Sequence, residues 1–202
     1  MYTGAQVSLY PMTDSFIDII MTALGALDPY RDRLRMETDD LSTLMIGPPD
    51  ALIPAMRDLF VSAASTGTHA VMHATLSRGC AGGPQLPGDD SVASTRAEGD
   101  LAERQAQARA AVQDAPEVGQ TVSAQFSLYV MGQGGHMDEI LGCIEVLKDS
   151  GVCTVEKNFC SRLDGDAGRV FATISEALYR FGPPVGHVTL VLTVSANSPS
   201  LA

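Results

Sequence analysis

The sequence predicts an α+β fold made of two tandem ferredoxin-like repeats. Each repeat has the order βαββαβ, and its two helices cover one face of a four-stranded antiparallel sheet. Two observations lead to this prediction. The chain of 202 residues resembles itself at a shift of 119 and then 118 residues, and each copy shows the same succession of strand-like and helix-like patterns. The predicted division is residues 1–79 for the first repeat, 80–122 for a connecting segment and 123–202 for the second repeat.

The internal repeat is clearest where each copy begins. Residues 5–12 (AQVSLYPM) return as residues 124–131 (AQFSLYVM). Further along, the equivalent pairs are Gly47 with Gly165, His69 with His187, Thr75 with Thr193, and Ser77 with Ser195. The two copies therefore span about residues 5–77 and 124–195, which is most of the chain.

Each repeat is predicted to begin with a strand and a helix. Residues 7–10 alternate apolar and polar side chains, as in a strand with one buried face. A helix follows, because apolar side chains recur at helical spacing and Thr13 or Asp14 can cap its start. Its predicted inward residues are Phe16, Ile17, Ile20, Leu24 and Leu27 in the first repeat, and Met137, Ile140, Leu141, Ile144 and Leu147 in the second.

A hairpin, a second helix and a last strand complete each repeat. Residues 34–39 and 41–46 form two short strands around a tight turn, and the prolines at 48 and 49 open the second helix. Residues 69–77 alternate again and form the last strand. The predicted inward residues of the second helices are Leu52, Ile53, Met56, Leu59, Phe60 and Ala63, and then Val170, Phe171, Ile174, Ala177 and Leu178.

The connecting segment has the composition of a linker, because it is rich in Gly, Pro, Ala and acidic residues. Within it, residues 99–112 lack β-branched side chains until their end and predict one polar helix.

The overall composition excludes several classes of protein. A formal net charge of −11 makes nucleic acid an unfavourable partner, since phosphates require a basic surface. We expect no membrane insertion, because no apolar run approaches the length of a membrane span. The first ten residues do not have the pattern of a signal peptide, and the four cysteines form no CxxC pair, so we expect a cytoplasmic protein with reduced thiols and no metal site.

One face of the sheet is left open in this topology, and its side chains can be read from the strand alternation. The first strand places Gln6, Ser8, Tyr10 and Met12 there. The last strand adds imidazole and hydroxyl groups, and we expect both strands at the centre of the sheet, with the hairpin strands outside. Such a mixture suits a small polar heteroaromatic ligand. It equally suits a solvated face or an interface between two sheets.

Three segments of the chain resemble the YkoF family of thiamin/hydroxymethylpyrimidine-binding proteins: residues 8–14 (SLYPMTD), 38–43 (TDDLST) and 192–199 (LTVSANSP). The resemblance extends over nearly the whole chain, including the order of the repeats. It implies a tandem pair of ACT-related domains that dimerises and has one thiamin-type site in each repeat. It also implies binding without catalysis, with no further cofactor, in the uptake or handling of thiamin or its pyrimidine precursor, and with a link to a vitamin transporter.

The motifs and the open face together single out candidate ligand-binding residues. In the first repeat they are Ser8, Tyr10, Met12, Asp14, Thr38, Asp39, Ser42, Thr43 and His73. In the second repeat they are Ser127, Tyr129, Met131, Ser161 and Thr189. Carboxylates and an aromatic face suit the thiazolium cation of thiamin, and hydroxyl groups can pair with its aminopyrimidine. Capping of a helix remains an alternative role for Asp14.

The chain departs from the family pattern in ways that concern its ligand. His73 stands where the family has Asn, and a Gly-rich run at 132–135 replaces the turn at Thr13 and Asp14. Lys157 aligns with Asp39 and brings a cation where the first repeat has an anion. We therefore expect the second site to bind thiamin more weakly or to prefer the neutral pyrimidine.

Two other classes of function remain open from the sequence. One is an ACT-like regulatory module that binds an amino acid or another small molecule, although two repeats use up the chain and leave no catalytic domain. The other is a purely structural dimer. We do not expect an enzyme, because no nucleophile motif accompanies the Ser and His residues of the open face.

Overall fold

The computed structural model describes residues 2–80, 95–131, 134–184 and 186–201. Most of the Gly/Pro-rich part of the connecting segment, and Gly132 and Gln133 of the Gly-rich run, lie outside the described residues. The order of strands and α-helices is β1 (Tyr2–Pro11), α1 (Phe16–Gly25), β2 (Arg35–Thr38), β3 (Thr43–Ile46), α2 (Pro49–Ala64), β4 (Ala70–Cys80), α3 (Leu101–Gln113), β5 (Thr121–Val130), α4 (His136–Asp149), β6 (Cys153–Glu156), β7 (Ser161–Asp166), α5 (Ala167–Arg180) and β8 (Val188–Ala196). This is the predicted α+β order, with βαββαβ occurring twice and α3 between the two copies.

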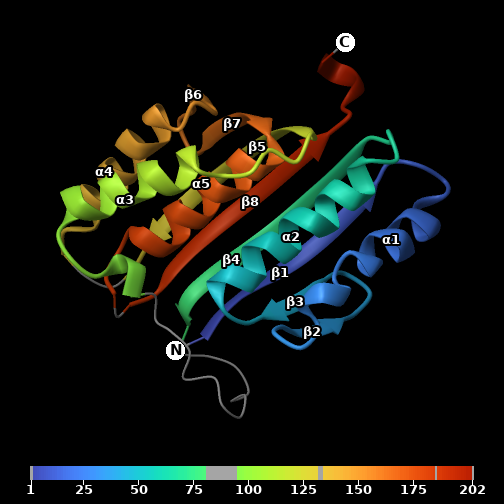
Figure 1. The fold of residues 1–202 in the computed structure, drawn as a ribbon, viewed down its shortest axis with the longest axis horizontal. Coiled ribbons are helices and arrows are strands. Elements are labelled where there is room, and N and C mark those ends of the chain that lie inside the picture. Colours follow the sequence, from blue (N-terminus) through green and yellow to red (C-terminus); the bar gives the residue numbers. More distant parts are fainter. Residues whose placement is uncertain (1, 81–94, 132–133, 185, 202) are drawn as a thin grey trace.

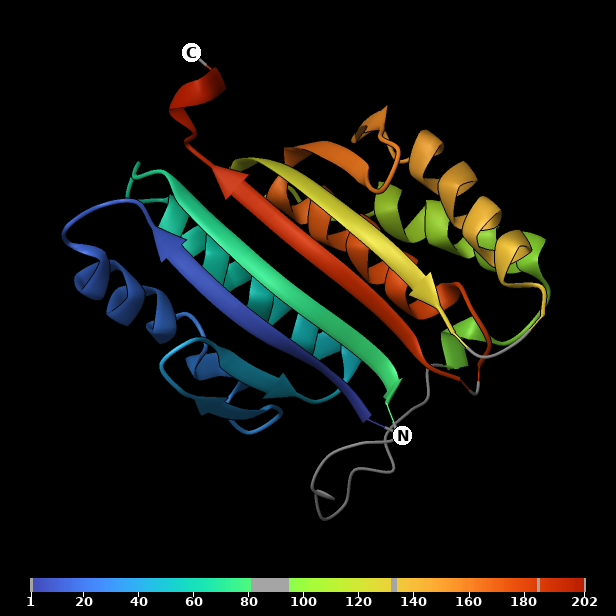
Figure 2. The ribbon, with the colours of Figure 1, turned by 180° about the vertical axis from the view of Figure 1, so that it is seen from behind.

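The strands form one continuous antiparallel sheet in the order β2-β3-β1-β4-β8-β5-β7-β6. The helices lie on one face of this sheet (Figure 1). The long strands β1, β4, β8 and β5 cross the other face, where no helix covers them (Figure 2). Each repeat therefore contributes four strands, as predicted, and the two halves are joined through β4 and β8.

The hairpin strands lie outside the four long strands, as expected, but the reason is the pairing of the two repeats. β3 lies between β2 and β1, and β7 lies between β6 and β5. Within its own repeat β4 is an edge strand, and it becomes central because it pairs with β8 of the other repeat. The pairing satisfies backbone groups that two separate sheets would leave exposed at their edges.

The joint between the repeats has local two-fold symmetry. Ala74 and Leu192 occupy equivalent positions in the two repeats, 118 residues apart, and they pair with each other across the joint. On the open face, His69 Nε2 lies 3.1 Å from Ser195 Oγ. The equivalent pair, His187 Nε2 and Ser77 Oγ, lies at 2.8 Å. The two matched histidines therefore connect the last strands of the two repeats.

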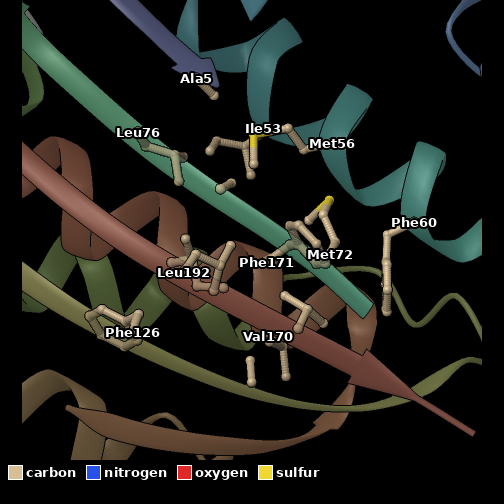
Figure 3. Close-up of a cluster of buried hydrophobic side chains, with 14 of the residues drawn as sticks. Ala5, Ile53, Met56, Phe60, Met72, Leu76, Phe126, Val170, Phe171 and Leu192 are labelled. Atoms are coloured by element: carbon tan, nitrogen blue, oxygen red, sulfur yellow. The ribbon is translucent and has the colours of Figure 1, made fainter. Parts of the chain in front are cut away.

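The core lies between the sheet and the helices α2 and α5, where side chains of β4, β8 and β5 meet the two helices (Figure 3). All the predicted inward residues of both helices are buried, including Phe60 and Phe171. Helical periodicity predicted these buried residues correctly because α2 and α5 lie across the middle of the sheet. The sheet presents an apolar surface to one side of each helix only.

The first helices of the repeats differ from the prediction. Phe16 and Ile17 of α1 and Met137 and Leu141 of α4 are exposed rather than buried. Of the predicted inward residues, Leu147 of α4 and Leu27, just beyond α1, are buried, and Leu24 packs against the core; Ala23, Cys143 and Val146 are also buried. The reason is local: these two helices cover the outer part of each half-sheet, where strand pairing stops before the end of β1 or β5.

Each repeat also caps a helix of the other repeat. Arg78, at the end of β4, is buried and donates hydrogen bonds to the carbonyl oxygens of Leu178, Phe181 and Pro183 around the end of α5, at 2.6–2.8 Å. Asn197, just after β8, donates its Nδ2 to the carbonyl oxygens of Ala64, the last residue of α2, and of Thr68 beyond it, at 2.7 and 3.0 Å. Both side chains provide donors for carbonyls that a helix end leaves without partners.

Candidate functional site

The first strand of each repeat has a free backbone edge near its end. β1 pairs with β4 along its whole length, but it pairs with β3 only from Gly4 to Val7. In the same way β5 pairs with β7 only as far as Phe126. Beyond these points the hairpin tip separates from the strand, and a cavity opens between the strand, the hairpin tip and the first helix of the repeat.

The first cavity has a volume of about 520 Å³, within the range of small-molecule sites. The predicted residues that line it are Ser8, Tyr10, Met12, Thr38, Asp39, Ser42 and Thr43. Apolar side chains of the helix layer, such as Ile20, Leu24 and Leu59, complete its wall. The cavity thus combines an apolar wall with hydroxyl and carboxylate groups on the strand and the hairpin.

The hairpin turn of the first cavity is held by side chains of β1 and by the side chain of Asp39. Ser8 Oγ donates to Leu41 O at 2.9 Å, and Gln6 Nε2 donates to Ser42 Oγ at 2.6 Å. Asp39 Oδ1 accepts from the backbone N–H groups of Leu41 and Ser42, each at 2.9 Å. These two hydrogen bonds hold the pKa of Asp39 below its ordinary value, so the cavity retains an anion at neutral pH.

The second cavity is about half as large, with a volume of about 260 Å³. The predicted residues Ser127, Tyr129 and Ser161 line it. Its hairpin turn has the same contact with the first strand as the turn of the first cavity, because Ser127 Oγ donates to Phe159 O at 2.7 Å. Burial raises the pKa of the Cys143 thiol in its wall to about 12, so this cysteine stays protonated and is no nucleophile at neutral pH.

The two cavities have opposite charge. Asp39 and Asp40 line the first, and no described residue in its lining carries a positive charge. Lys157 and Asn158 occupy the matching stretch of the second, whose described lining contains no carboxylate. The first cavity can therefore stabilise a cation, and the second can stabilise an anion or a neutral group.

Four predicted site residues lie outside both cavity linings. His73 Nδ1 lies 3.2 Å from Thr193 Oγ1, and Thr189 Oγ1 lies 3.2 Å from His187 Nε2, so both belong to the central strands of the open face. Asp14 and Met131 lie beyond the ends of β1 and β5. Asp14 does not cap α1 either, because the helix begins at Phe16 and its N-cap residue Ser15 makes no side-chain cap.

The apolar residues that surround the cavities were not predicted as site residues from the sequence. Leu41 and Phe159, at the tips of the two hairpins, are 76% and 89% exposed, and both line their cavities. Phe16 also lines the first cavity, although its spacing placed it in the core. A signal was present: α1 carries more large apolar residues than a single buried face requires, and an exposed apolar surface of this kind marks a binding site.

In the described residues, no group of three or more His, Cys, Asp or Glu side chains is arranged to hold a metal ion. No helix among them combines the length and apolar character that crossing a membrane requires.

Comparisons with known proteins agree with this architecture. The model of the YKOF-related family matches residues 2–83 and again residues 121–201. The chain is 34% identical over 198 residues to a Bacillus subtilis (strain 168) protein named "Putative HMP/thiamine-binding protein YkoF", a match that covers 98% of this chain and 91% of the relative. Each of the two matched ranges contains one βαββαβ unit and its cavity beside the free edge of the first strand, which we call the edge cavity. The chain belongs to the YKOF-related family.

Proposed function

We propose that the chain binds thiamin or its hydroxymethylpyrimidine part in the two edge cavities, one in each repeat, without catalysing a reaction. The observation that carries this proposal is the first cavity, where predicted residues from the first strand and the hairpin come together around a volume suited to a small molecule. Membership of the YKOF-related family and the name of the Bacillus relative support a binding role.

The chemistry of the first cavity suits thiamin in particular. Thiamin carries a permanently charged thiazolium ring, which the carboxylates of Asp39 and Asp40 attract. Tyr10 is 49% exposed at the cavity and offers an aromatic face to either ring. The hydroxyl groups of Thr38 and Thr43, 3.0 Å apart, can donate to or accept from the aminopyrimidine.

The hydroxyl groups of Ser8 and Ser127 support binding rather than nucleophilic catalysis. Ser8 and Ser127 both donate to backbone carbonyl oxygens and not to a general base. A protein that binds thiamin or its pyrimidine without changing it would serve the uptake or handling of these compounds.

Calorimetric titration of the full chain with thiamin tests the proposal. We expect Tyr10→Ala to weaken binding at the first cavity about tenfold, through loss of stacking and cation–π contact. His73→Ala is the matched control on the central open face, and it should leave the affinity unchanged. A larger loss of affinity in His73→Ala than in Tyr10→Ala would place the binding site on the open face. Failure of both thiamin and hydroxymethylpyrimidine to bind would overturn the proposal.

A further inference from the structure

The hairpin turns of the two cavities have the same backbone hydrogen bonds. Asp39 N donates to Ser42 O at 3.0 Å in the first repeat, and Lys157 N donates to Cys160 O at 2.9 Å in the second. The serine of the first strand also donates to a backbone carbonyl oxygen of the turn in both repeats: Ser8 to Leu41 O and Ser127 to Phe159 O. The two turns are therefore equivalent, and only their side chains differ.

In the first repeat this turn binds an anion that belongs to the chain. The carboxylate of Asp39 accepts from two successive backbone N–H groups, those of Leu41 and Ser42. The lowered pKa of Asp39 reflects the stabilisation of its negative charge by these donors. Successive N–H groups that converge in this way form an anion-binding nest.

In the second repeat the nest lacks its carboxylate. The equivalent N–H groups belong to Phe159 and Cys160, and none of the described residues provides an acceptor for either. Lys157 takes the place of Asp39 and has no acceptor atom in its side chain. Its ammonium group adds a positive charge to the lining of the cavity.

These observations indicate which form of the ligand suits the second cavity. If the proposed function holds, we infer that this cavity binds the pyrimidine as its phosphate ester, with the ester anion on the N–H groups of Phe159 and Cys160 and beside the ammonium of Lys157. The volume of about 260 Å³ suits one ring better than the two rings of thiamin. The negative charge of the chain as a whole disfavours anions elsewhere, so a site for an anion requires local donors of this kind.

An amide NMR titration of the full chain tests the inference directly. The probes are hydroxymethylpyrimidine, its phosphate ester and inorganic phosphate. We expect the ester alone to shift the amide protons of Phe159 and Cys160 downfield, because they gain a charged acceptor. The amides of Leu41 and Ser42 are an internal control, since Asp39 already occupies them. At the second cavity the ester should bind about tenfold more tightly than the alcohol.

Two substitutions separate the contributions of the lysine and the nest. Lys157→Gln should reduce the preference for the ester, whereas Lys148→Gln, an exposed lysine of α4 outside the cavity lining, should not. Lys157→Asp should abolish the preference, because the new carboxylate can occupy the nest as Asp39 does. Unchanged amide spectra away from the turn show that each variant is folded.

Equal affinity of the ester and the alcohol at the second cavity would overturn the inference and leave the proposed function intact. Inorganic phosphate that binds as tightly as the ester would also overturn it, because the site would then ignore the pyrimidine. Failure of thiamin, the alcohol and the ester to reach either cavity would instead refute the proposed function.

Discussion

The two edge cavities occupy equivalent places in the two repeats, yet they differ in size and charge. One has two carboxylates in about 520 Å³, and the other has an amine and an amide in about 260 Å³. The backbone hydrogen bonds of their turns are the same. The duplicated fold thus provides the place for a ligand, and a few side chains at the hairpin tip determine which charge that ligand can carry.

The largest effect is expected at the joint between the two repeats, which holds the two halves of the sheet together. Arg78→Met removes the donors of three carbonyl oxygens in a buried environment, so we expect the free energy of unfolding to fall by about 3 kcal/mol. Urea denaturation measures this loss. Asn197→Gly removes the cap that the second repeat provides for α2 and tolerates the positive φ of this residue (56°). It should lower the free energy of unfolding by only about 1 kcal/mol, because the Asn197 side chain is neutral. Equal losses would contradict this difference between the two caps.

The next effect concerns the charge of the first cavity. Asp39→Lys introduces the residue of the second repeat, and we expect the affinity for thiamin at the first cavity to fall roughly a hundredfold, because attraction becomes repulsion. Asp39→Asn keeps an acceptor for the backbone N–H groups of the turn, so the affinity for thiamin should fall only about tenfold. Calorimetry measures both.

The control for Asp39→Lys is Glu117→Lys, which makes the same change of charge on an exposed residue outside both cavity linings. It should leave thiamin binding within about twofold of the original, since salt screens distant charges. A comparable loss in the control would show that the net charge of the protein, and not the turn, determines the preference.

The smallest expected effect is a difference between the two repeats in how their stability depends on pH. Asp164 of β7 accepts hydrogen bonds from Arg162, Thr154 and Ser123, whereas the equivalent position in β3 is Ile46. The Arg162 guanidinium holds the pKa of Asp164 well below its usual range. The ionised carboxylate therefore contributes stability above about pH 4, and this is lost as pH falls toward its lower folded-state pKa.

Asp164→Asn should lower the free energy of unfolding at pH 7 by about 0.5 kcal/mol, since the ion pair is partly exposed. The difference between the original chain and the variant should shrink as the pH is lowered from about 5 to 3. Chemical denaturation at several pH values measures it, and a difference that does not depend on pH would contradict the assignment to this carboxylate.

Periodicity predicted the parts of the fold where one face is buried and the other is not. The strands, the buried faces of α2 and α5 and the internal repeat were all visible in the sequence, because alternation and helical spacing report such faces directly. The same reasoning failed for Phe16, which lines the first cavity instead of the core, and for Ile17, which is exposed.

The joint between the repeats and the cavities themselves could not be predicted in the same way. Pairing of β4 with β8 brings together residues more than a hundred positions apart, and strand pattern alone does not say which edges meet. The cavities depend on where β1 and β5 lose their hairpin partners, which is a matter of register. Motif residues on the hairpin and the first strand were nevertheless predicted, whereas His73 and Thr189 belong to the joint.

A crystal structure of the full chain with thiamin would locate the ligand directly. We expect thiamin in the first cavity, with its thiazolium ring beside Asp39 and a ring against Tyr10. Thiamin bound instead on the open face over β4 and β8, against His73 and Thr193, would contradict the claim that the edge cavities are the binding sites.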